Sequence, residues 1–582
     1  MTTKLSELKK TNSRSELAKL LGIEPKHLSY TLYIMPLAKR YREFTVPKRS
    51  GDKRVIFAPN PRLKAIQSRT SVMLYKCYNE LYPKTNNKSL NLSHAFQKQR
   101  GLSIASNGQK HRNKRYVFNL DFEDFFGSFN FGRVRGFFLS NRDFSLNEEV
   151  ATSLAQICCY DNKLPQGAPT SPIITEFITR ILDIRLSKIA KAHGCSYSRY
   201  ADDLTFSTNK RTFPSQIAQC DPSGTWRVGS EVLNKINNSG FSVNSSKTRM
   251  QFADRRQETT GLVVNKKVNV PKEYSKQIRY MTHALLQTGK CHVQAPVTKE
   301  MQDVSPNVLA GKLAHEFHIK SKEYVDSNGK PWPLSRFKDK KISVPAFYRR
   351  YSDFLYFRSF FFNTKPTILC EGKTDNIYLK YALKSKYACV PSLAVTSPTK
   401  KKVELHFYFY NYSNTACTVT TLTGGAQPLK SFIENYEKEM KKFKAASVSQ
   451  PVIAVVDNDA ANNGLWKMLE EKFNYEDADG TREFYYVVKN LYIVPIPKID
   501  GNDTFIEHLF DQETRDTPLG GKTFDLYQKK TKKMDADKYG KMAFATKVIQ
   551  KKHKSINFDH FVPLLENIEK AIAHHRTNLP SA

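Results

Sequence analysis

The stretch Cys195–Ser207, which reads Cys-Ser-Tyr-Ser-Arg-Tyr-Ala-Asp-Asp-Leu-Thr-Phe-Ser, decides how the rest of the chain is interpreted. Two β-rich runs flank Asp202 and Asp203, so the stretch predicts a short hairpin with both carboxylates at its tip. Adjacent carboxylates repel one another unless cations neutralise them, and Mg²⁺ is the hard cation that seeks such oxygens. Taken alone, the pattern is also typical of a solvated hairpin that binds no metal.

A third carboxylate stands at the end of another predicted strand, because Asp121 follows the β-rich run Tyr116–Leu120. In-line phosphoryl transfer between two metal ions about 4 Å apart needs bridging carboxylates from different strands. Asp121 and Asp202 meet that need. The sequence therefore predicts a site for two Mg²⁺ ions at Asp121, Asp202 and Asp203.

Two further stretches extend this pattern. Leu164–Pro172 is rich in small and fixed-φ residues, which let a backbone pass close to a flat partner before a helix begins near Ile173. Gly240–Arg249 contains Lys247, whose side chain could contact a phosphate.

In this order, the stretches resemble the palm of reverse transcriptases. Asp121 falls in the first carboxylate motif, Gln166-Gly167 in the template-positioning loop and Tyr200–Asp203 in the signature turn. The resemblance implies an α+β right-hand polymerase with fingers, palm and thumb, which takes deoxynucleoside triphosphates. It also places Gln166, Gly167 and Lys247 among the residues that bind the nucleotide.

The resemblance assigns roles to three more side chains of the fingers and palm. Phe44–Ala58 predicts a basic hairpin, and the equivalent hairpin of reverse transcriptases closes over the triphosphate, so Lys48 and Arg54 are candidates for that contact. Phe126 stands where these enzymes have an aromatic gate against a ribose 2′-OH. The plainer alternatives are solvated cations and a core phenylalanine.

Two other elements are similar to markers of retron reverse transcriptases. Asn107–His111 stands where those enzymes carry Asn-Ala-x-x-His, with Gly108 in place of Ala, and Thr259–Gly261 stands in place of Val-Thr-Gly. The resemblance assigns RNA binding to four residues, Asn107, His111, Thr260 and Gly261. Without it, Asn107 and His111 are equally typical of a polar loop that caps its own backbone.

The length of the chain indicates several domains, and its net charge indicates the kind of partner that it binds. The 582 residues are too many for one core, and 92 Lys plus Arg against 55 Asp plus Glu give a net charge of +37. Such an excess favours a polyanion, with nucleic acid preferred over a membrane surface. No run approaches the ~20 apolar residues of a spanning helix and Met1–Lys10 has no signal-peptide core, so a cytoplasmic protein without membrane partners is expected.

Cysteine usage gives no sign of disulfides or structural zinc. The nine Cys include no Cys-x-x-Cys pair, and Cys158-Cys159 lie in an apolar run that predicts packed thiols.

The ends of the polymerase region are predicted to be helical. Ser13–Glu16 forms a capping box that opens a helix, and we interpret residues 1–40 as a helical cap on the fingers, with a helix-turn-helix as the alternative. Fingers and palm then cover 41–265. The basic, aromatic stretch Tyr274–Phe362 predicts helices, so 266–364 is assigned to the thumb and its connection.

A second unit with catalytic character follows, over 365–582. The predicted strands Thr367–Cys370 and Pro451–Val456 end in Glu371 and in Asp457-Asn458-Asp459. Acidic residues at the carboxyl ends of parallel strands are where α/β folds place their sites, and such a set can hold Mg²⁺.

This second arrangement resembles a Toprim domain, an α/β fold with a parallel sheet. The resemblance gives metal-binding and catalytic roles to Glu371, Asp457 and Asp459, and makes Glu507 and Lys541 candidates for an extra acid and a basic partner. The alternative is an unrelated α/β module in which the acids only cap helices.

Together the resemblances imply a retron-type RNA-directed DNA polymerase fused to a Toprim nuclease. They imply copying of a structured non-coding RNA into branched RNA-linked DNA (msDNA) through an RNA–DNA heteroduplex, a nucleic-acid target for the nuclease, a role in antiphage defence, and a homo-oligomer that holds the msDNA. The alternatives are another group II-like reverse transcriptase whose C-terminal domain only binds nucleic acid, and a non-catalytic RNA-binding scaffold.

Overall fold

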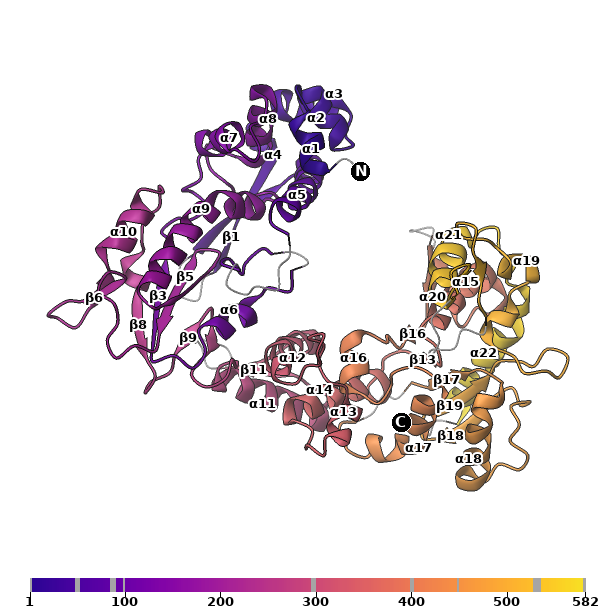
Figure 1. The fold of residues 1–582 in the computed structure, drawn as a ribbon. Coiled ribbons are helices and arrows are strands. Elements are labelled where there is room, and N and C mark those ends of the chain that lie inside the picture. The colour runs from indigo at the N-terminus through magenta and orange to yellow at the C-terminus, as the bar shows by residue number, and fades with distance from the viewer. Residues whose placement is uncertain are drawn as a thin grey trace. The chain divides into compact units, whose positions relative to one another are not determined.

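The computed structural model describes residues 3–47, 53–83, 91–97, 100–294, 300–397, 402–446, 450–526 and 535–578. The chain forms two compact units, Met1–Pro271 and Lys272–Ala582 (Figure 1). The division falls close to the predicted end of the palm at residue 265.

The N-terminal unit is built on a four-stranded antiparallel sheet in the order β4-β5-β3-β8. Its strands are β3 (Tyr116–Asp121), β4 (Ser196–Tyr200), β5 (Asp203–Thr208) and β8 (Arg249–Phe252). The predicted strand before Asp121 and the predicted hairpin are both confirmed. The long helix α9 (Ser171–Ala192) packs against β4.

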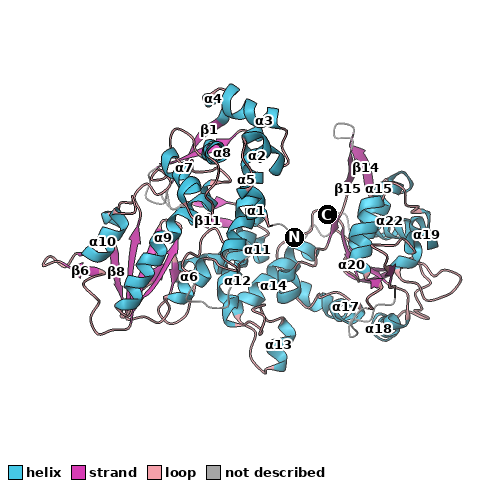
Figure 2. Ribbon diagram, turned by 45° about the horizontal axis from the view of Figure 1, so that its top comes forward, coloured by secondary structure: helices cyan, strands magenta, loops and turns pink. Residues whose placement is uncertain are grey.

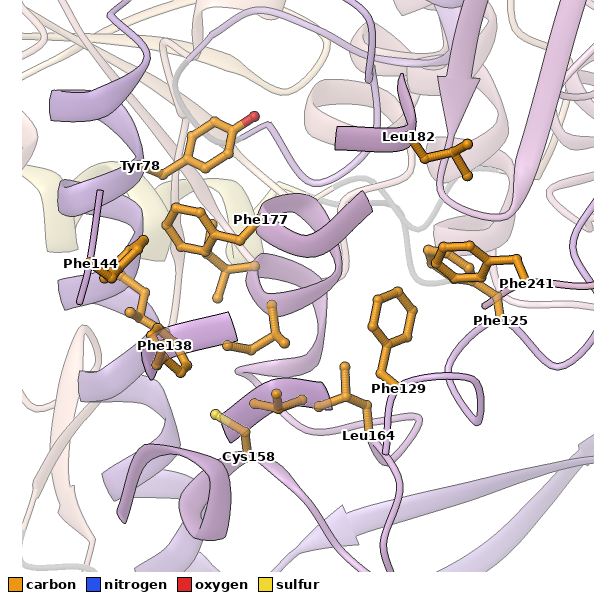
Figure 3. Packing of buried hydrophobic residues seen from close by; sticks show 14 of the residues in the cluster. Tyr78, Phe125, Phe129, Phe138, Phe144, Cys158, Leu164, Phe177, Leu182 and Phe241 are labelled. Atoms are coloured by element: carbon orange, nitrogen blue, oxygen red, sulfur yellow. The ribbon is translucent and has the colours of Figure 1, made fainter. Parts of the chain in front are cut away.

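Aromatic side chains fill the core beside this sheet. Phe125, Phe129, Phe138, Phe144 and Phe177 are almost fully buried and meet mostly edge to face (Figure 3). Rings in this arrangement add roughly 0.5–1.5 kcal/mol a pair to what their area burial contributes. This packing holds α9 and the segment after Asp121 in fixed positions.

Besides α9, the N-terminal unit contains helices of between 4 and 21 residues. The Ser13 cap of α2 is confirmed, since Ser13 Oγ accepts from the N–H of Glu16 at 3.2 Å. The Glu16 carboxylate accepts from the N–H of Asn12, one residue earlier than a capping box requires. The helices are α1 (Lys4–Lys9), α2 (Arg14–Leu20), α3 (Pro25–Ser29), α4 (Leu37–Arg40), α5 (Pro61–Leu81), α6 (Ile104–Lys110), α7 (Phe131–Ser140), α8 (Glu148–Cys158) and α10 (Ser230–Asn237).

Three hairpins complete the N-terminal unit. The hairpin predicted over Phe44–Ala58 is confirmed, with β1 (Tyr41–Pro47) antiparallel to β2 (Lys53–Pro59), and we call it the fingers hairpin after the resemblance. Lys48 and the predicted turn at Ser50–Asp52 lie outside the described residues. The other hairpins pair β6 (Ala218–Cys220) with β7 (Trp226–Val228), and β9 (Glu258–Thr259) with β10 (Leu262–Val263).

The C-terminal unit opens with the helices predicted for Tyr274–Phe362. They are α11 (Lys272–Thr288), α12 (Pro306–Lys320), α13 (Leu334–Asp339) and α14 (Ala346–Tyr356), with a hairpin of β11 (His292–Gln294) and β12 (Met301–Asp303) between the first two. Side chains of α11 and of Phe357–Phe361 share one hydrophobic core with the sheet that follows. That core crosses the predicted domain boundary at 364.

A mostly parallel sheet in the order β16-β13-β17-β19-β18 lies at the centre of this unit. Strands β16 (Tyr408–Phe409), β13 (Thr367–Cys370), β17 (Val452–Val456) and β19 (Leu491–Pro495) are parallel neighbours, and β18 (Tyr485–Val488) is an antiparallel edge. Alternate residues of β17 enter two separate cores, so both faces of the sheet are covered. The predicted parallel pairing of the first and second acidic strands is confirmed.

Helices lie on both faces of this sheet (Figure 2). Those packed with one core are α16 (Asn414–Val419), α17 (Ala426–Met440) and α18 (Asn463–Phe473). The other core includes α15 (Asp375–Lys386) and α22 (Val562–Thr577). The remaining elements are β14 (Ala394–Ser397), β15 (Lys402–Leu405), β20 (Thr523–Phe524), β21 (Lys538–Tyr539), α19 (Gln512–Arg515), α20 (Lys541–Ala543) and α21 (Gln550–Lys552).

Two general features bear on the expectations above. In the described part of the chain, no helix is at once long enough and apolar enough to cross a membrane. All nine cysteines are free thiols, with Cys158 buried and Cys159 half-buried.

Candidate active sites

The sheet of the N-terminal unit brings the three predicted carboxylates together. Antiparallel pairing of β3 with β5 places Asp121 directly opposite Asp203, and the N–H of Phe122 donates to the main-chain oxygen of Asp202 at 3.1 Å. Burial, followed by the charges of Asp202 and Asp121, raises the pKa of Asp203 to about 7. Burial and the charge of Asp121 also raise the pKa of Asp202. The trio therefore carries an electrostatic cost that a bound cation would relieve.

Lys247 already offsets part of this charge. Its Nζ donates to Asp121 Oδ1 at 2.7 Å, and this hydrogen bond raises the pKa of Lys247. The predicted nucleotide-binding lysine thus lies among the carboxylates. No three Asp, Glu, His or Cys side chains in the described ranges already form a metal-holding group. Three carboxylates on two adjoining strand ends nevertheless supply the oxygen donors that suit Mg²⁺.

A cavity of about 870 Å³ opens beside the trio. Asp121, Asp202 and Lys247 form one part of its wall, and Arg54 of the fingers hairpin lines it as well. Arg54 and the carboxylates therefore line one cavity, and contact of Arg54 with a triphosphate stays a prediction. Lys48 cannot be placed, because it falls outside the described residues.

The predicted template loop packs against the fingers hairpin. The N–H of Phe57 donates to the main-chain oxygen of Gln166 at 2.8 Å, and Gln166 lines the same cavity. Gly167 has φ +122°, and a Cβ there would stand 2.7 Å from the Phe57 oxygen. Glycine is needed on both counts, because other residues rarely adopt this φ and would collide with β2.

Phe126 is half-buried in the cavity wall. Its ring meets Phe125 edge to face at 5.5 Å, while the residue lines the cavity that contains Asp121. The core alternative and the gate prediction are thus both compatible with its position.

A second cavity, of about 350 Å³, also borders the carboxylates. It is lined by Asp121 and Asp203 and by Thr260 and Gly261 at the tip of the β9–β10 hairpin. Both tip residues have positive φ, +50° for Thr260 and +76° for Gly261. Thr260 and Gly261 therefore share a cavity wall with the carboxylates, and their contact with RNA stays a prediction.

Asn107 and His111 are completely buried, which sequence reasoning did not anticipate. Ser198 Oγ donates to Asn107 Oδ1 at 2.5 Å, and the His111 ring nitrogens lie 2.7 Å from Ser198 Oγ and 2.7 Å from Ser207 Oγ. The alternative of a self-capping loop is wrong, because residues 104–110 form α6. RNA contact by these side chains stays a prediction that their burial does not support.

Sequence reasoning also missed a buried network beneath the Asp-Asp turn. Arg199 is fully buried, donates from Nε and Nη2 to the two oxygens of Asp183 at 2.9 Å each, and lies 3.2 Å from Glu176. Its Nη1 donates to the main-chain oxygen of Ala201 at 3.0 Å. An arginine inside a β-rich run was the available signal, since a buried arginine needs carboxylate partners.

In the C-terminal unit, Glu371 follows β13 and Asp457 follows β17, so the two acids stand at neighbouring strand ends. The N–H of Asp457 donates to Glu371 Oε2 at 3.3 Å. Asn462, which the sequence did not single out, donates from Nδ2 to Glu371 Oε2 at 2.9 Å and to the main-chain oxygen of Asp457 at 2.8 Å. This amide fixes the spacing of the two strand ends.

The accessory residues lie close to the same point. Asp457 Oδ1 accepts from the N–H of Ile506 at 3.1 Å, next to buried Glu507, whose Oε2 accepts from Lys541 Nζ at 2.9 Å. Burial and then the charge of Asp375 raise the pKa of Asp457 well above its ordinary value. Asp375, a buried acid that the sequence analysis did not include in the site, therefore belongs to this cluster.

Among the acidic residues of this cluster, Asp459 agrees best with the alternative in which the acids only cap helices. Its Oδ1 accepts from the N–H of Ala461 at 3.1 Å, which caps the short 3-10 helix Ala460–Asn462. Burial raises the pKa of Asp459. The cluster offers carboxylate oxygens from three stretches of the chain, residues 371–375, 457–459 and 507, a donor set that suits Mg²⁺ in the same way as the trio of the N-terminal unit.

Comparison with known proteins agrees with the N-terminal site. Residues 46–285 match the family described as "Reverse transcriptase (RNA-dependent DNA polymerase)". The retron Ec86 reverse transcriptase of Escherichia coli is 32% identical over 275 residues, which cover 47% of this chain and 78% of that protein. The chain belongs to the family of retron reverse transcriptases.

Two further relatives come from Myxococcus xanthus. The retron Mx65 reverse transcriptase is 33% identical over 263 residues, covering 42% of this chain and 56% of that protein. The retron Mx162 reverse transcriptase is 33% identical over 302 residues, covering 47% and 59%. The chain thus spans little more than half the length of these two relatives. Among solved structures, apo telomerase from Candida tropicalis aligns with a TM-score of 0.27 and 14% identity over 41% of this chain and 56% of that one.

Proposed function

We propose that this chain is an RNA-directed DNA polymerase of the retron kind, which copies a structured non-coding RNA into msDNA. The observation that carries the proposal is the cavity where Asp121 and Asp202 face the fingers cation Arg54. Bound Mg²⁺ at the trio would stabilise charge on the reacting phosphate. The family relationship supports the same activity.

The chain's own side chains have separable tasks in this proposal. Arg54 attracts the anionic triphosphate to the cavity, and the Gln166–Gly167 loop holds the template strand beside β2. Phe126 limits the space next to the sugar, which favours deoxynucleotides. Lys247 neutralises Asp121 until a cation arrives.

Primer extension tests this proposal. Asp202→Asn and Asp203→Asn should each abolish DNA synthesis on a primed RNA template in Mg²⁺, while a variant of an exposed aspartate, Asp254→Asn, keeps it. Retained extension by the Asp202→Asn protein would disprove the site assignment. Sequencing of nucleic acid that copurifies with the wild type should identify branched RNA-linked DNA.

We also propose that the C-terminal unit is a metal-dependent nuclease of the Toprim type that acts as an antiphage effector. Glu371 and Asp457 at the ends of adjacent parallel strands, with the Glu507–Lys541 pair beside them, support this assignment. Bound Mg²⁺ would polarise a phosphodiester there. The second candidate is a unit that only binds nucleic acid, which the capping role of Asp459 favours.

The two candidates for the C-terminal unit differ in one assay. Incubation of the protein with DNA and RNA in Mg²⁺ should give cleavage that Glu371→Gln abolishes and that a surface variant, Glu434→Gln, leaves intact. Equal cleavage by both variants, or none by the wild type, would favour the binding module.

The remaining partners of the proposal are deoxynucleoside triphosphates, the RNA–DNA heteroduplex, a cytoplasmic nucleic-acid target and further copies of this chain.

A further inference from the structure

Phe96 lies in the wall of the cavity of about 870 Å³ beside the carboxylates, and its main chain is strained. Its φ is +55°, and it is the only aromatic residue among the described non-glycine residues with positive φ. A bulky side chain is unfavourable in this left-handed region, whereas glycine adopts it freely. Strain of this kind persists only where the surrounding structure enforces it, and it is concentrated at functional sites.

Hydrogen bonds on both sides of Phe96 enforce its conformation. The side chains of Ser93 and Gln97 donate to the two carboxylate oxygens of buried Glu176, at 2.9 Å and 2.6 Å. The hydroxyl of Tyr75 donates to the main-chain oxygen of Phe96 at 2.8 Å. The chain is therefore fixed before, at and after the strained residue.

The same segment is joined to the strand that ends in the Asp-Asp turn. The N–H of His94 donates to the main-chain oxygen of Arg199 at 2.9 Å, and the N–H of Arg199 donates to that of Leu92 at 2.9 Å. Ala201 at the corner of the turn lines the same cavity as Phe96. The position of the Phe96 ring is therefore tied to the element that presents the carboxylates.

The requirements of the core do not explain an aromatic residue at this position. Phe126 packs against the large core of the N-terminal unit, whereas Phe96 is not among the described side chains that do so. In the described part of the chain, its ring meets no other aromatic ring. The side chain is half-buried, and it lines the cavity. Glycine would remove the strain, so the ring must contribute something in the cavity itself.

A partly exposed phenyl ring in this cavity suits a nucleobase. The charged groups of the wall suit other ligands, because Asp121 and Asp202 attract cations while Arg54 and Lys163 attract phosphates. Neither a metal ion nor a triphosphate gains from contact with Phe96. A nucleobase does, because its flat face stacks on aromatic side chains whatever its identity.

We propose that Phe96 is a positioning residue of the polymerase, whose ring stacks on one nucleobase of the primed template beside the reaction centre. The strained main chain holds the ring in a fixed relation to the Asp-Asp turn, so the stacked base is held there as well. This proposal rests on the proposed function, since it takes the cavity to hold a primed template.

Affinity for a primed template tests this role without catalysis. A fluorescein-labelled RNA template annealed to a DNA primer is titrated with the full chain in the absence of nucleotides. Phe96→Ala should weaken binding about tenfold, which is the contribution typical of stacking on one base. Phe96→Tyr keeps a ring and should bind like the wild type. Wild-type affinity in Phe96→Ala would overturn the proposal.

A matched control removes a ring elsewhere in the same unit. Phe131→Ala truncates a half-buried phenylalanine of α7 that packs against the large core and is not among the residues that line the cavity. It should bind the primed template like the wild type. A loss as large as that of Phe96→Ala would show general loosening of the unit and overturn the specific role of Phe96.

Comparison of Phe96→Gly with Phe96→Ala separates stacking from folding. Glycine accepts the φ of +55° that strains alanine, so the glycine variant should have the higher melting temperature. Both variants lack the ring and should bind the primed template equally weakly. Affinity that followed the melting temperature would make Phe96 a structural residue only.

Abasic nucleotides identify the stacked base. One is placed in turn at each position near the primer terminus, first in the template strand and then in the primer. At one position the wild type should lose about tenfold in affinity while Phe96→Ala loses little, because the base and the ring are partners in one interaction. The strand that contains this position is the source of the base. Equal losses in both proteins at every position would overturn stacking.

These measurements are independent of the polymerase proposal. A wild type that extends no primer would disprove the polymerase, yet the affinities of the Phe96 variants would still support or overturn the stacking role. In an active polymerase, a raised KM for the nucleotide with unchanged affinity for the primed template would place Phe96 at the nucleotide and overturn this proposal alone.

Discussion

Arg199 donates from Nη1 to the main-chain oxygen of Ala201, 3.0 Å away, and so joins the buried carboxylates of α9 to the corner of the Asp-Asp turn. Ala201 has φ +56°, a left-handed conformation that costs an alanine roughly 1–2 kcal/mol. The guanidinium therefore acts as a positioning group, because it holds a strained turn in the shape that presents Asp202 and Asp203.

Substitution of this arginine should affect both stability and catalysis, because Asp183 and Glu176 are buried against it. Arg199→Lys keeps the charge beside Asp183 but cannot reach both Asp183 oxygens and the Ala201 oxygen. We expect primer extension to fall about tenfold and the Mg²⁺ concentration for half-maximal rate to rise, with little change in KM for the nucleotide. Tyr197→Phe is the control, because it removes another bond to Asp183 and leaves Ala201 alone. A wild-type rate and Mg²⁺ dependence in Arg199→Lys would contradict the positioning role.

Gly167→Ala should weaken the template loop. The added Cβ would lie 2.7 Å from the Phe57 oxygen at a φ of +122°, so we expect a loss of about 1–3 kcal/mol in stability and a marked loss of primer extension. Gly136→Ala is the matched control, since it lies in α7 with nothing within 4 Å of the new Cβ and should stabilise the helix. Melting temperatures and extension rates of both variants are to be compared; similar effects in the two would show that the loop tolerates a side chain.

Phe126→Ala should admit ribonucleotides, because it opens the cavity wall near Asp121. The measurement is incorporation of ribonucleoside against deoxyribonucleoside triphosphates on the same primed template. Phe137→Ala, which removes a half-buried ring of the same core that does not line the cavity, serves as the control for general loosening. If the Phe126→Ala protein still excludes ribonucleotides, Phe126 is a core residue and not a gate.

The two acidic sites should be separable by substitution. Glu371→Gln, or Asp457→Asn with Asp459→Asn, should abolish nuclease activity and phage protection while DNA synthesis survives, because each leaves a cation short of ligands. Asp203→Asn should abolish DNA synthesis and, if the reverse-transcribed product restrains the effector, change phage protection without altering Glu371. Chelation of Mg²⁺ should stop both activities. Full protection by Glu371→Gln would leave the C-terminal unit as a binding module.

Acid should loosen the strands around His111. Burial, and then Lys110, His94 and Lys114, lower the pKa of His111 well below its usual 6.5. Below about pH 6.5 the unfolded chain binds a proton that the folded chain refuses, so stability falls by up to about 1.4 kcal/mol per pH unit. Amide hydrogen exchange in β4 and β5 reports the local stability of these strands. The wild type should be more stable than His111→Gln at pH 7.5, and this difference in stability should be smaller at pH 5.5. An equal difference at both pH values would contradict a neutral buried ring.

Local patterns in the sequence were enough to predict the strand before Asp121, the Asp-Asp hairpin and the two separate strands that end in Glu371 and Asp457. Each of these elements is formed by residues that are close to one another in sequence. The burial of His111 depends on Ser198 and Ser207, which are distant in sequence and were not part of any motif. Partners of this kind become visible only when the strands are in register.

Asn462 and Arg199 escaped sequence analysis for a related reason. Asn462 follows the acidic pair closely, but only the parallel pairing of β13 with β17 brings Glu371 to its amide. Arg199 meets Asp183 because α9 packs on β4. Lys247 was noticed as a phosphate contact, whereas in the structure it pairs with Asp121 across 126 positions of sequence.

The core that α11 and Phe357–Phe361 share with the C-terminal sheet has a practical consequence for anyone who shortens the chain. A protein cut after residue 364 would lose the partners of Phe357 and Phe360, which are at most 1% exposed. Exposed aromatic surface of that kind promotes aggregation. Insolubility of such a truncated protein would therefore say nothing about whether the polymerase needs the second unit for catalysis.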